Sequence, residues 1–111
     1  MERIALKVQR RCYARAAVDE VAVHHRIART VGPGGGLVEM RETFLHDGHV
    51  CMAFERHGRS LSRALRRGPL PPARVRRVAR VLAEALERMH RCGYAHTDVN
   101  PGNVLYDPRP C

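Results

Sequence analysis

Residues 73–91 carry the strongest structural pattern in the chain and constrain its fold most. Apolar side chains recur there at helical spacing, and arginines and glutamates fill most of the other positions. This pattern predicts an amphipathic helix whose apolar stripe needs a partner layer. The stripe consists of Val75, Val78, Val81, Leu82, Ala85, Leu86 and Met89. We expect the helix to end at Cys92-Gly93, because glycine readily adopts the left-handed cap conformation.

The segment directly after this helix, residues 96–105, reads His-Thr-Asp-Val-Asn-Pro-Gly-Asn-Val-Leu. Asp98 and Asn103 flank a Pro-Gly turn that leads into an apolar run. We therefore expect one carboxylate and one amide oxygen to face the same small volume. Phosphoryl transfer uses such a pair, a carboxylate to accept a hydroxyl proton and an oxygen ligand for the metal on the phosphates.

Shorter patterns predict the remaining elements and give a mixed α+β order. Asp47-Gly48 between two strand-like runs is a hairpin signal, and Ser60 can cap a helix. In chain order we expect a strand at residues 3–9, a helix at 13–29, a glycine-rich connector at 32–36, strands at 37–44 and 49–54, a short helix at 60–67, a linker at 68–72 and, after the main helix, a strand at 104–106. The connector follows a helix and precedes a strand, which is the wrong order for a phosphate-binding loop.

The chain is basic, with a net charge of +9, and nearly all of its basic residues are arginines: Lys7 is the only lysine among 20. A basic surface suits acidic partners or nucleic acid. Arginines spread over solvated helix faces explain the same composition, and few aromatic residues are present to stack on bases. Nucleic acid is therefore not the favoured partner. A nucleic-acid binder that uses the arginine-rich residues 74–91 is kept as an alternative.

The four cysteines stand singly, without the paired spacing of a structural zinc site, so we expect reduced, packing cysteines. The adjacent His24 and His25 are expected on a helix surface, since neighbouring side chains on a helix diverge. No stretch has the length and apolarity of a membrane span, and the N-terminus lacks a signal-peptide layout. We expect an intracellular protein of the cytoplasm or nucleus, with no membrane partner.

Lys7 and Glu20 form a second candidate group. Lys7 ends an Ala-Leu-Lys-Val run, and Glu20 lies on the helix expected next. A lysine that grips phosphates needs a carboxylate to hold its flexible ammonium group in place. The spacing alone is also compatible with a solvated glutamate on an exposed face. We expect an ion pair between these two side chains.

Three stretches, residues 13–20, 48–55 and 96–98, resemble protein kinases in sequence and in order. They are most similar to the dual-specificity Clk (LAMMER) kinases and the SR-protein kinases, of which a threonine at the position of Thr97 is typical. The resemblance covers nearly the whole chain. It implies an incomplete protein-kinase-like fold, a partial kinase domain with a small-lobe portion at 1–57 and the start of the large lobe at 58–111.

By this resemblance the chain would use ATP and Mg²⁺ to phosphorylate protein serine or threonine, with an arginine- and serine-rich protein as substrate. The implied roles follow in chain order. Lys7 would bind the ATP phosphates, Glu20 would pair with it, Phe54 would close the back of the adenine pocket, Glu55 and His57 would belong to the hinge that binds the base, Asp98 would be the catalytic base, Asn100 would occupy the second catalytic position, and Asn103 would bind magnesium.

Two departures weaken the implied activity. Asn100 stands where the family has a lysine that neutralises the transferred phosphate, and Gly102 replaces the usual glutamate. The 111 residues also contain neither the family's glycine loop before Lys7 nor an Asp-Phe-Gly segment after Tyr106. We expect these residues alone to be inactive. The alternative is a non-catalytic, truncated pseudokinase that acts as an interaction module.

Overall fold

The structure is a computed structural model that describes residues 3–32 and 34–108. The chain divides into two compact units, Met1–Arg56 and His57–Cys111. Pro33 of the predicted connector and Cys111 of the four cysteines lie outside the described residues. The other three cysteines are unpaired thiols, Cys12 exposed and both Cys51 and Cys92 buried.

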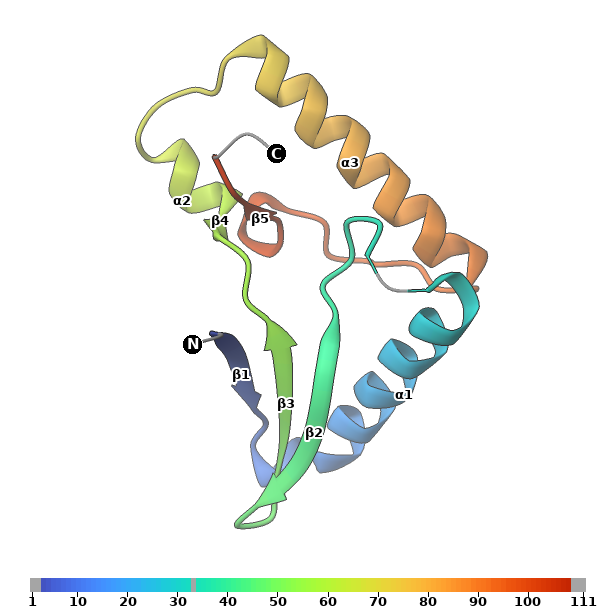
Figure 1. Cartoon of the computed structure of the whole chain (residues 1–111). Coiled ribbons are helices and arrows are strands. Elements are labelled where there is room, and N and C mark those ends of the chain that lie inside the picture. The colour runs from blue at the N-terminus through green and yellow to red at the C-terminus, as the bar shows by residue number, and fades with distance from the viewer. Residues whose placement is uncertain (1–2, 33, 109–111) are drawn as a thin grey trace. The chain divides into compact units, whose positions relative to one another are not determined.

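The first unit is an antiparallel sheet with one long helix beside it (Figure 1). Its elements are the strand β1 (Ile4–Val8), the 3-10 turn η1 (Arg11–Tyr13), the helix α1 (Ala14–Val31) and the strands β2 (Met40–His46) and β3 (His49–Glu55). The strand order is β1-β3-β2, so β3 is flanked on both sides. The predicted strand at 3–9 and helix at 13–29 are confirmed.

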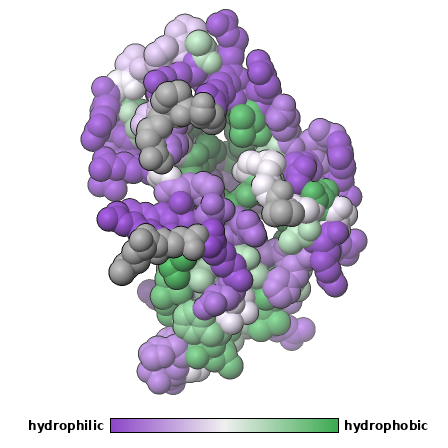
Figure 2. All heavy atoms as spheres, in the orientation of Figure 1, coloured by the Kyte–Doolittle hydropathy of each residue, from purple (hydrophilic) through white to green (hydrophobic). Residues whose placement is uncertain are grey.

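The core of this unit lies between α1 and the central strand. Ala17 and Met52 are fully buried, and Val50 is nearly so. The small side chain of Ala17 lets the helix approach β3 closely. Alternate residues of β1 point away from this core, and Ile4, Leu6 and Val8 are each about half exposed. Figure 2 shows the resulting apolar colouring over the strands in the lower part of the view.

A two-residue turn joins β2 and β3. Asp47 and Gly48 both have positive φ, 49° and 78°, which is the pattern of a type I′ hairpin turn whose twist matches that of the strands. The hairpin prediction is confirmed at this pair. The expected strand bounds were wrong: β2 begins later, at Met40, and continues through His46 to the turn.

The second unit contains β4 (Arg59–Ser60), α2 (Leu61–Leu65), α3 (Pro72–Arg91), the 3-10 turn η2 (Pro101–Asn103) and β5 (Leu105–Tyr106). The Ser60 side chain accepts a hydrogen bond from Arg63 N at 3.2 Å, so the predicted cap is confirmed. α2 is shorter than expected. Its end tightens through bonds from Arg67 N to Ala64 O and from Gly68 N to Leu65 O.

A short antiparallel ladder between β4 and β5 was not anticipated, although a strand at the position of β5 was. Arg59 pairs with Tyr106, and Ser60 pairs with Leu105. A Cβ atom on Gly58 would lie 2.5 Å from Tyr106 O, so only glycine permits this close approach of the two backbones. The Leu61 N–H also bonds Val104 O at 2.7 Å. These contacts fix the C-terminal end of residues 96–105.

The predicted main helix is confirmed as α3, and Gly93 follows it at φ 87°. Within its apolar stripe Ala85 is buried, whereas Val75 and Val81 are about half exposed. Among the described residues, no helix combines the length and apolarity needed to cross a membrane.

Candidate functional site

The loop after α3 brings Asp98, Asn100 and Asn103 into direct contact. Asn100 Nδ2 donates to Asp98 Oδ1 at 3.0 Å, and Asn103 Nδ2 donates to Asp98 Oδ2 at 3.1 Å. Both amides also bond the Asp98 main-chain carbonyl, at 3.3 and 2.9 Å. The expectation that Asp98 and Asn103 face one small volume is confirmed. Each carboxylate oxygen is held by a different amide, so the rotation of the carboxylate is restricted.

Asn100 also stabilises the turn that follows it. Its Oδ1 accepts from Gly102 N at 2.8 Å, and its main-chain carbonyl accepts from Asn103 N at 2.9 Å. A Cβ on Gly102 would lie 2.9 Å from Asn100 Oδ1, closer than side chains normally approach. The two departures from the kinase pattern, Asn100 and Gly102, are therefore in contact with each other. Asn100, which stands where the family has lysine, therefore uses both polar atoms of its side chain: Nδ2 donates to Asp98, and Oδ1 accepts from Gly102 N.

Thr97 holds the backbone in an unusual conformation immediately before Asp98. Its φ is 70°, a region that a β-branched residue rarely adopts and that costs roughly 1–3 kcal/mol. The Asp98 N–H donates to His96 Nδ1 at 3.2 Å, which helps to hold this turn. A neutral His96 that accepts at Nδ1 carries its proton on Nε2. Strain of this kind persists only where surrounding contacts over-determine the conformation.

In the first unit, Lys7 and Glu20 form the predicted ion pair. Lys7 Nζ lies 2.9 Å from Glu20 Oε1 and 3.0 Å from Oε2. The two side chains are 47% and 32% exposed, so the pair is accessible from solvent and contributes little to stability. Its use is geometric, since it ties a flexible lysine on β1 to one position on α1.

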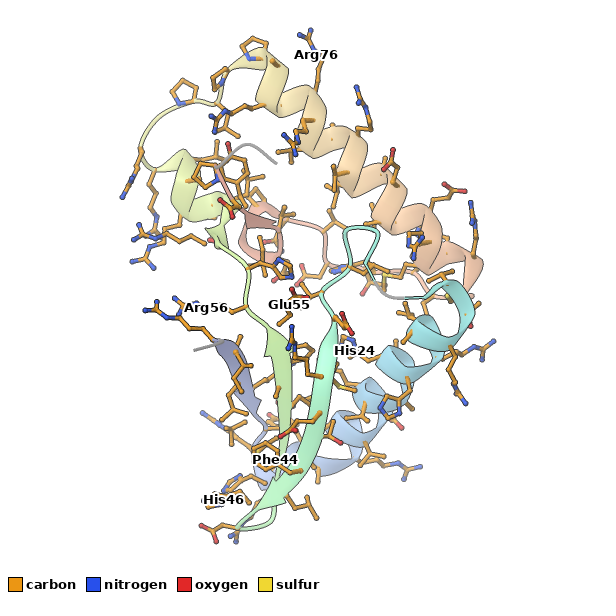
Figure 3. The ribbon with its side chains drawn as sticks, in the orientation of Figure 1. His24, Phe44, His46, Glu55, Arg56 and Arg76 are labelled. Carbon is orange, nitrogen blue, oxygen red and sulfur yellow. The ribbon has the colours of Figure 1, made fainter. Side chains whose placement is uncertain are left out.

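The face of α1 that carries Glu20 is fixed by its helical neighbours. Ala17 lies one turn before Glu20 and is fully buried, and His24 lies one turn after it on the same face. The His24 ring meets the Phe54 ring edge-on, with centroids 5.2 Å apart and an interplanar angle of 60°. Figure 3 shows the His24 side chain directed toward the strands.

The expectation that His24 lies on the helix surface is wrong. Its side chain is partly buried against Phe54, whereas the neighbouring His25 is exposed. Burial lowers the pKa of His24 below the ordinary value of 6.5, because a charged imidazole is poorly solvated there. Nearby Lys7 and His25 act in the same direction, and Glu20 opposes them. The spacing of four residues from Glu20 was the sequence signal for this position.

Replacing His24 with leucine is expected to reduce the pH dependence of stability. The unfolded state binds a proton at a higher pH than the folded state does, so this group's contribution is complete above about pH 6.5 and is lost as the pH falls through the lowered folded pKa. Urea unfolding at about pH 7.5 and about pH 5.5, which bracket the ordinary imidazole pKa, measures the difference. The exposed His25→Leu variant is the matched control. An equal reduction in both variants would contradict the assignment to His24.

The predicted hinge residues lie at the end of β3 and just beyond it. Phe54 stands opposite Ala5 of β1 and Met40 of β2. The Glu55 N–H donates to Glu39 O at 3.0 Å, so this N–H is already used within the first unit. His57 begins the second unit. The structure thus brings together Lys7 with Glu20 in one unit and Asp98 with both asparagines in the other.

Comparison with known proteins identifies the family of the chain. The family model described as "Protein kinase domain" matches residues 2–110. The serine/threonine-protein kinase AFC1 of Arabidopsis thaliana is 36% identical over 94% of this chain and 23% of its own length. The protein kinase dsk1 of Schizosaccharomyces pombe is 35% identical over 93% of this chain and 21% of its own length.

A third relative, the probable serine/threonine-protein kinase clkA of Dictyostelium discoideum, is 27% identical over 94% of this chain and 12% of its own length. The chain thus spans between 12% and 23% of the length of these three relatives. The family match itself extends over nearly all of the 111 residues. The chain belongs to the protein kinase domain family.

Proposed function

We propose that this chain supplies the phosphate-gripping lysine and the catalytic loop of an ATP-dependent serine/threonine kinase of the Clk and SR-protein kinase type. The observation that carries the proposal is the Asp98 carboxylate, held by the amides of Asn100 and Asn103. A general base must keep a fixed orientation toward the hydroxyl group that it deprotonates. The Lys7–Glu20 pair supports the proposal from the other unit.

Each proposed role follows from the chemistry of the group. Asp98 accepts the proton of the substrate hydroxyl as that oxygen attacks the γ-phosphorus of ATP, and ADP leaves with the electron pair of the broken bond. Lys7 binds the phosphate oxygens, with Glu20 as its anchor. Phe54 borders the adenine, and the backbone near Glu55 and His57 binds the base, although not through the Glu55 N–H.

Asn103 fits the role of a magnesium ligand. Its Nδ2 is directed to Asp98, and the oxygen of the same amide therefore points away from that carboxylate. Magnesium commonly takes only one or two protein oxygens besides waters and substrate phosphates. The ion, when bound, would neutralise charge on the phosphates. The substrate proposed from the resemblance is an arginine- and serine-rich protein.

A second candidate function, a non-catalytic interaction module, is favoured by two observations. Asn100 gives the loop an amide in place of a cationic group, which removes charge stabilisation of the transferred phosphate. The exposed apolar residues Ile4, Leu6 and Val8 also leave one side of β1 available for contact. The two functions differ in whether phosphate transfer occurs when these residues are joined to a glycine loop and an Asp-Phe-Gly segment of the family.

A chimeric kinase tests the proposal. Residues 4–106 replace the matching segment of AFC1, so that AFC1 supplies the family's glycine loop and Asp-Phe-Gly segment. We expect the chimera to transfer radiolabelled phosphate from ATP to an arginine–serine peptide, and residues 1–111 alone to show no transfer. Intact AFC1 is the positive control, and thermal unfolding verifies that the chimera folds. A folded chimera without transfer, even with lysine at position 100, would favour the interaction module.

A further inference from the structure

A pocket of about 490 Å³ in the second unit is bordered by an unusual number of arginines. It lies among β4, α2, the start of α3 and the segment after β5, and none of residues 96–103 lines it. The arginines that line it are Arg59, Arg63, Arg67 and Arg74. The pocket is therefore distinct from the loop that carries Asp98.

The local structure explains why these side chains meet. Arg63 lies within α2 and Arg67 lies in the turn that directly follows it, and both side chains line the pocket. Arg59 precedes α2 on β4, where its pairing with Tyr106 places it beside the chain that continues to Pro108. Arg59, Arg63 and Arg67, which are spaced four residues apart in the sequence, thus line the same pocket.

One of the four guanidinium groups is engaged within the unit. Arg74 Nη1 donates to Tyr106 Oη at 2.8 Å and to Pro108 O at 3.0 Å. Its charge is nevertheless not compensated by a carbonyl or a hydroxyl group. This contact fixes Arg74 as the rigid side of the pocket, because it joins α3 to the segment after β5.

The other three arginines have no acidic partner within residues 3–32 and 34–108. No carboxylate there lies within ion-pair distance of Arg59, Arg63 or Arg67. Among the residues lining the pocket, Asp107 is the one acid facing four cations. Like charges brought together in this way repel, and a bound anion would remove that repulsion.

We infer that this pocket binds a peptide that carries a phosphorylated serine or threonine. A phosphate carries nearly two negative charges and three acceptor oxygens, which suits several converging guanidinium groups better than a single carboxylate does. Arginine also matches phosphate geometry through its planar, bidentate fork. Ala64, Leu70 and Pro108 supply apolar contacts for the residues beside the phosphate.

Nucleic acid fits the same pocket less well. Single strands bind through bases stacked on aromatic faces as well as through phosphate contacts. Tyr106 is the one aromatic residue lining the pocket, and its hydroxyl is held by Arg74. Phosphopeptide binding is independent of the proposed catalytic function, since neither Lys7 nor the Asp98 loop takes part in it.

Fluorescence anisotropy of the full chain with a labelled phosphoserine peptide tests this inference. The site variant combines Arg59→Gln, Arg63→Gln and Arg67→Gln. The control variant combines Arg29→Gln, Arg76→Gln and Arg80→Gln, which removes the same charge from exposed helix positions. In Figure 3, Arg76 projects outward from α3. We expect the dissociation constant to rise at least about tenfold in the site variant, as the loss of charge-assisted bonds implies, and less than about twofold in the control.

A variant with lysine at the three site positions keeps the charge and distinguishes loss of binding contacts from misfolding of the glutamine variant. It keeps the cations but loses the fork, so weakening of about severalfold is expected. Three results would overturn the inference: equal weakening in the site and control variants, equal affinity for the unphosphorylated peptide, or tighter binding of a single-stranded RNA of the same charge. No measurable phosphopeptide binding up to about millimolar concentration would also overturn it.

Discussion

The chimeric kinase is expected to lose about 10²–10⁴-fold in the rate of phosphate transfer when Asp98 is replaced by asparagine, the usual contribution of a positioned general base. The substitution removes the group that we propose accepts the hydroxyl proton. It also turns one carboxylate oxygen into an amide nitrogen, which cannot accept the hydrogen bond that Asn100 or Asn103 now donates. Single-turnover transfer of radiolabelled phosphate to an arginine–serine peptide measures the effect.

Two controls separate chemistry from folding in that experiment. Asp19→Asn removes an exposed acid from α1 and should leave the rate unchanged. Asn100→Ala keeps the Asp98 carboxylate but deletes one of its two amide donors, and we expect a smaller loss than for Asp98→Asn. If Asp98→Asn lowered the rate no more than Asn100→Ala does, Asp98 would be a structural residue of the loop rather than its base.

The Asn100→Lys substitution is expected to raise phosphate transfer by the chimera about 10²-fold, near the lower end of what one preorganised charged or hydrogen-bonding group supplies. An ammonium group can neutralise charge that develops on the transferred phosphate, and an amide cannot. The same single-turnover assay, at saturating ATP, measures the gain. An unchanged rate with intact folding would show that the amide is compatible with full activity.

The same Asn100→Lys substitution is expected to lower stability, because it removes a hydrogen bond of the loop. Lysine has no acceptor for the Gly102 N–H, which Asn100 Oδ1 now binds at 2.8 Å. We expect the free energy of unfolding of the lysine variant to fall by about 1 kcal/mol, as for one lost hydrogen bond. Asn100→Ala should lose at least as much stability, because it also removes the donor to Asp98, and should show no gain in rate. The comparison separates the effect of the lysine charge on the rate from the effect of the lost hydrogen bond on stability.

Much of the secondary structure could be predicted because it depends on local rules. The periodicity of residues 73–91 and the glycine at 93 define α3, and Asp47-Gly48 defines the hairpin turn. Ser60 acts as the expected cap. The β4–β5 ladder could not be predicted in this way, because its two-residue strands have no pattern of their own and pair across a long sequence separation.

The candidate site shows the same division at the level of single residues. The resemblance to kinases indicated Lys7, Glu20, Asp98 and Asn103, and their side-chain types already limited the chemistry. The contact between His24 and Phe54 was missed because burial depends on which helix face meets the sheet. The dual role of Asn100 was missed because both its partners, the Asp98 carboxylate and the Gly102 N–H, are defined only by the conformation of the turn.

By itself, the sequence determined the family, the order of the main elements and the residue types available for phosphoryl transfer, since these follow from motifs and from short-range periodicity. The tertiary structure decided which side chains meet. Lys7 reaches Glu20 because α1 packs its Ala17 face on β3. Three arginines line one pocket because β4 pairs with β5 ahead of α2. Such meetings depend on packing between segments distant in sequence, which no local pattern encodes.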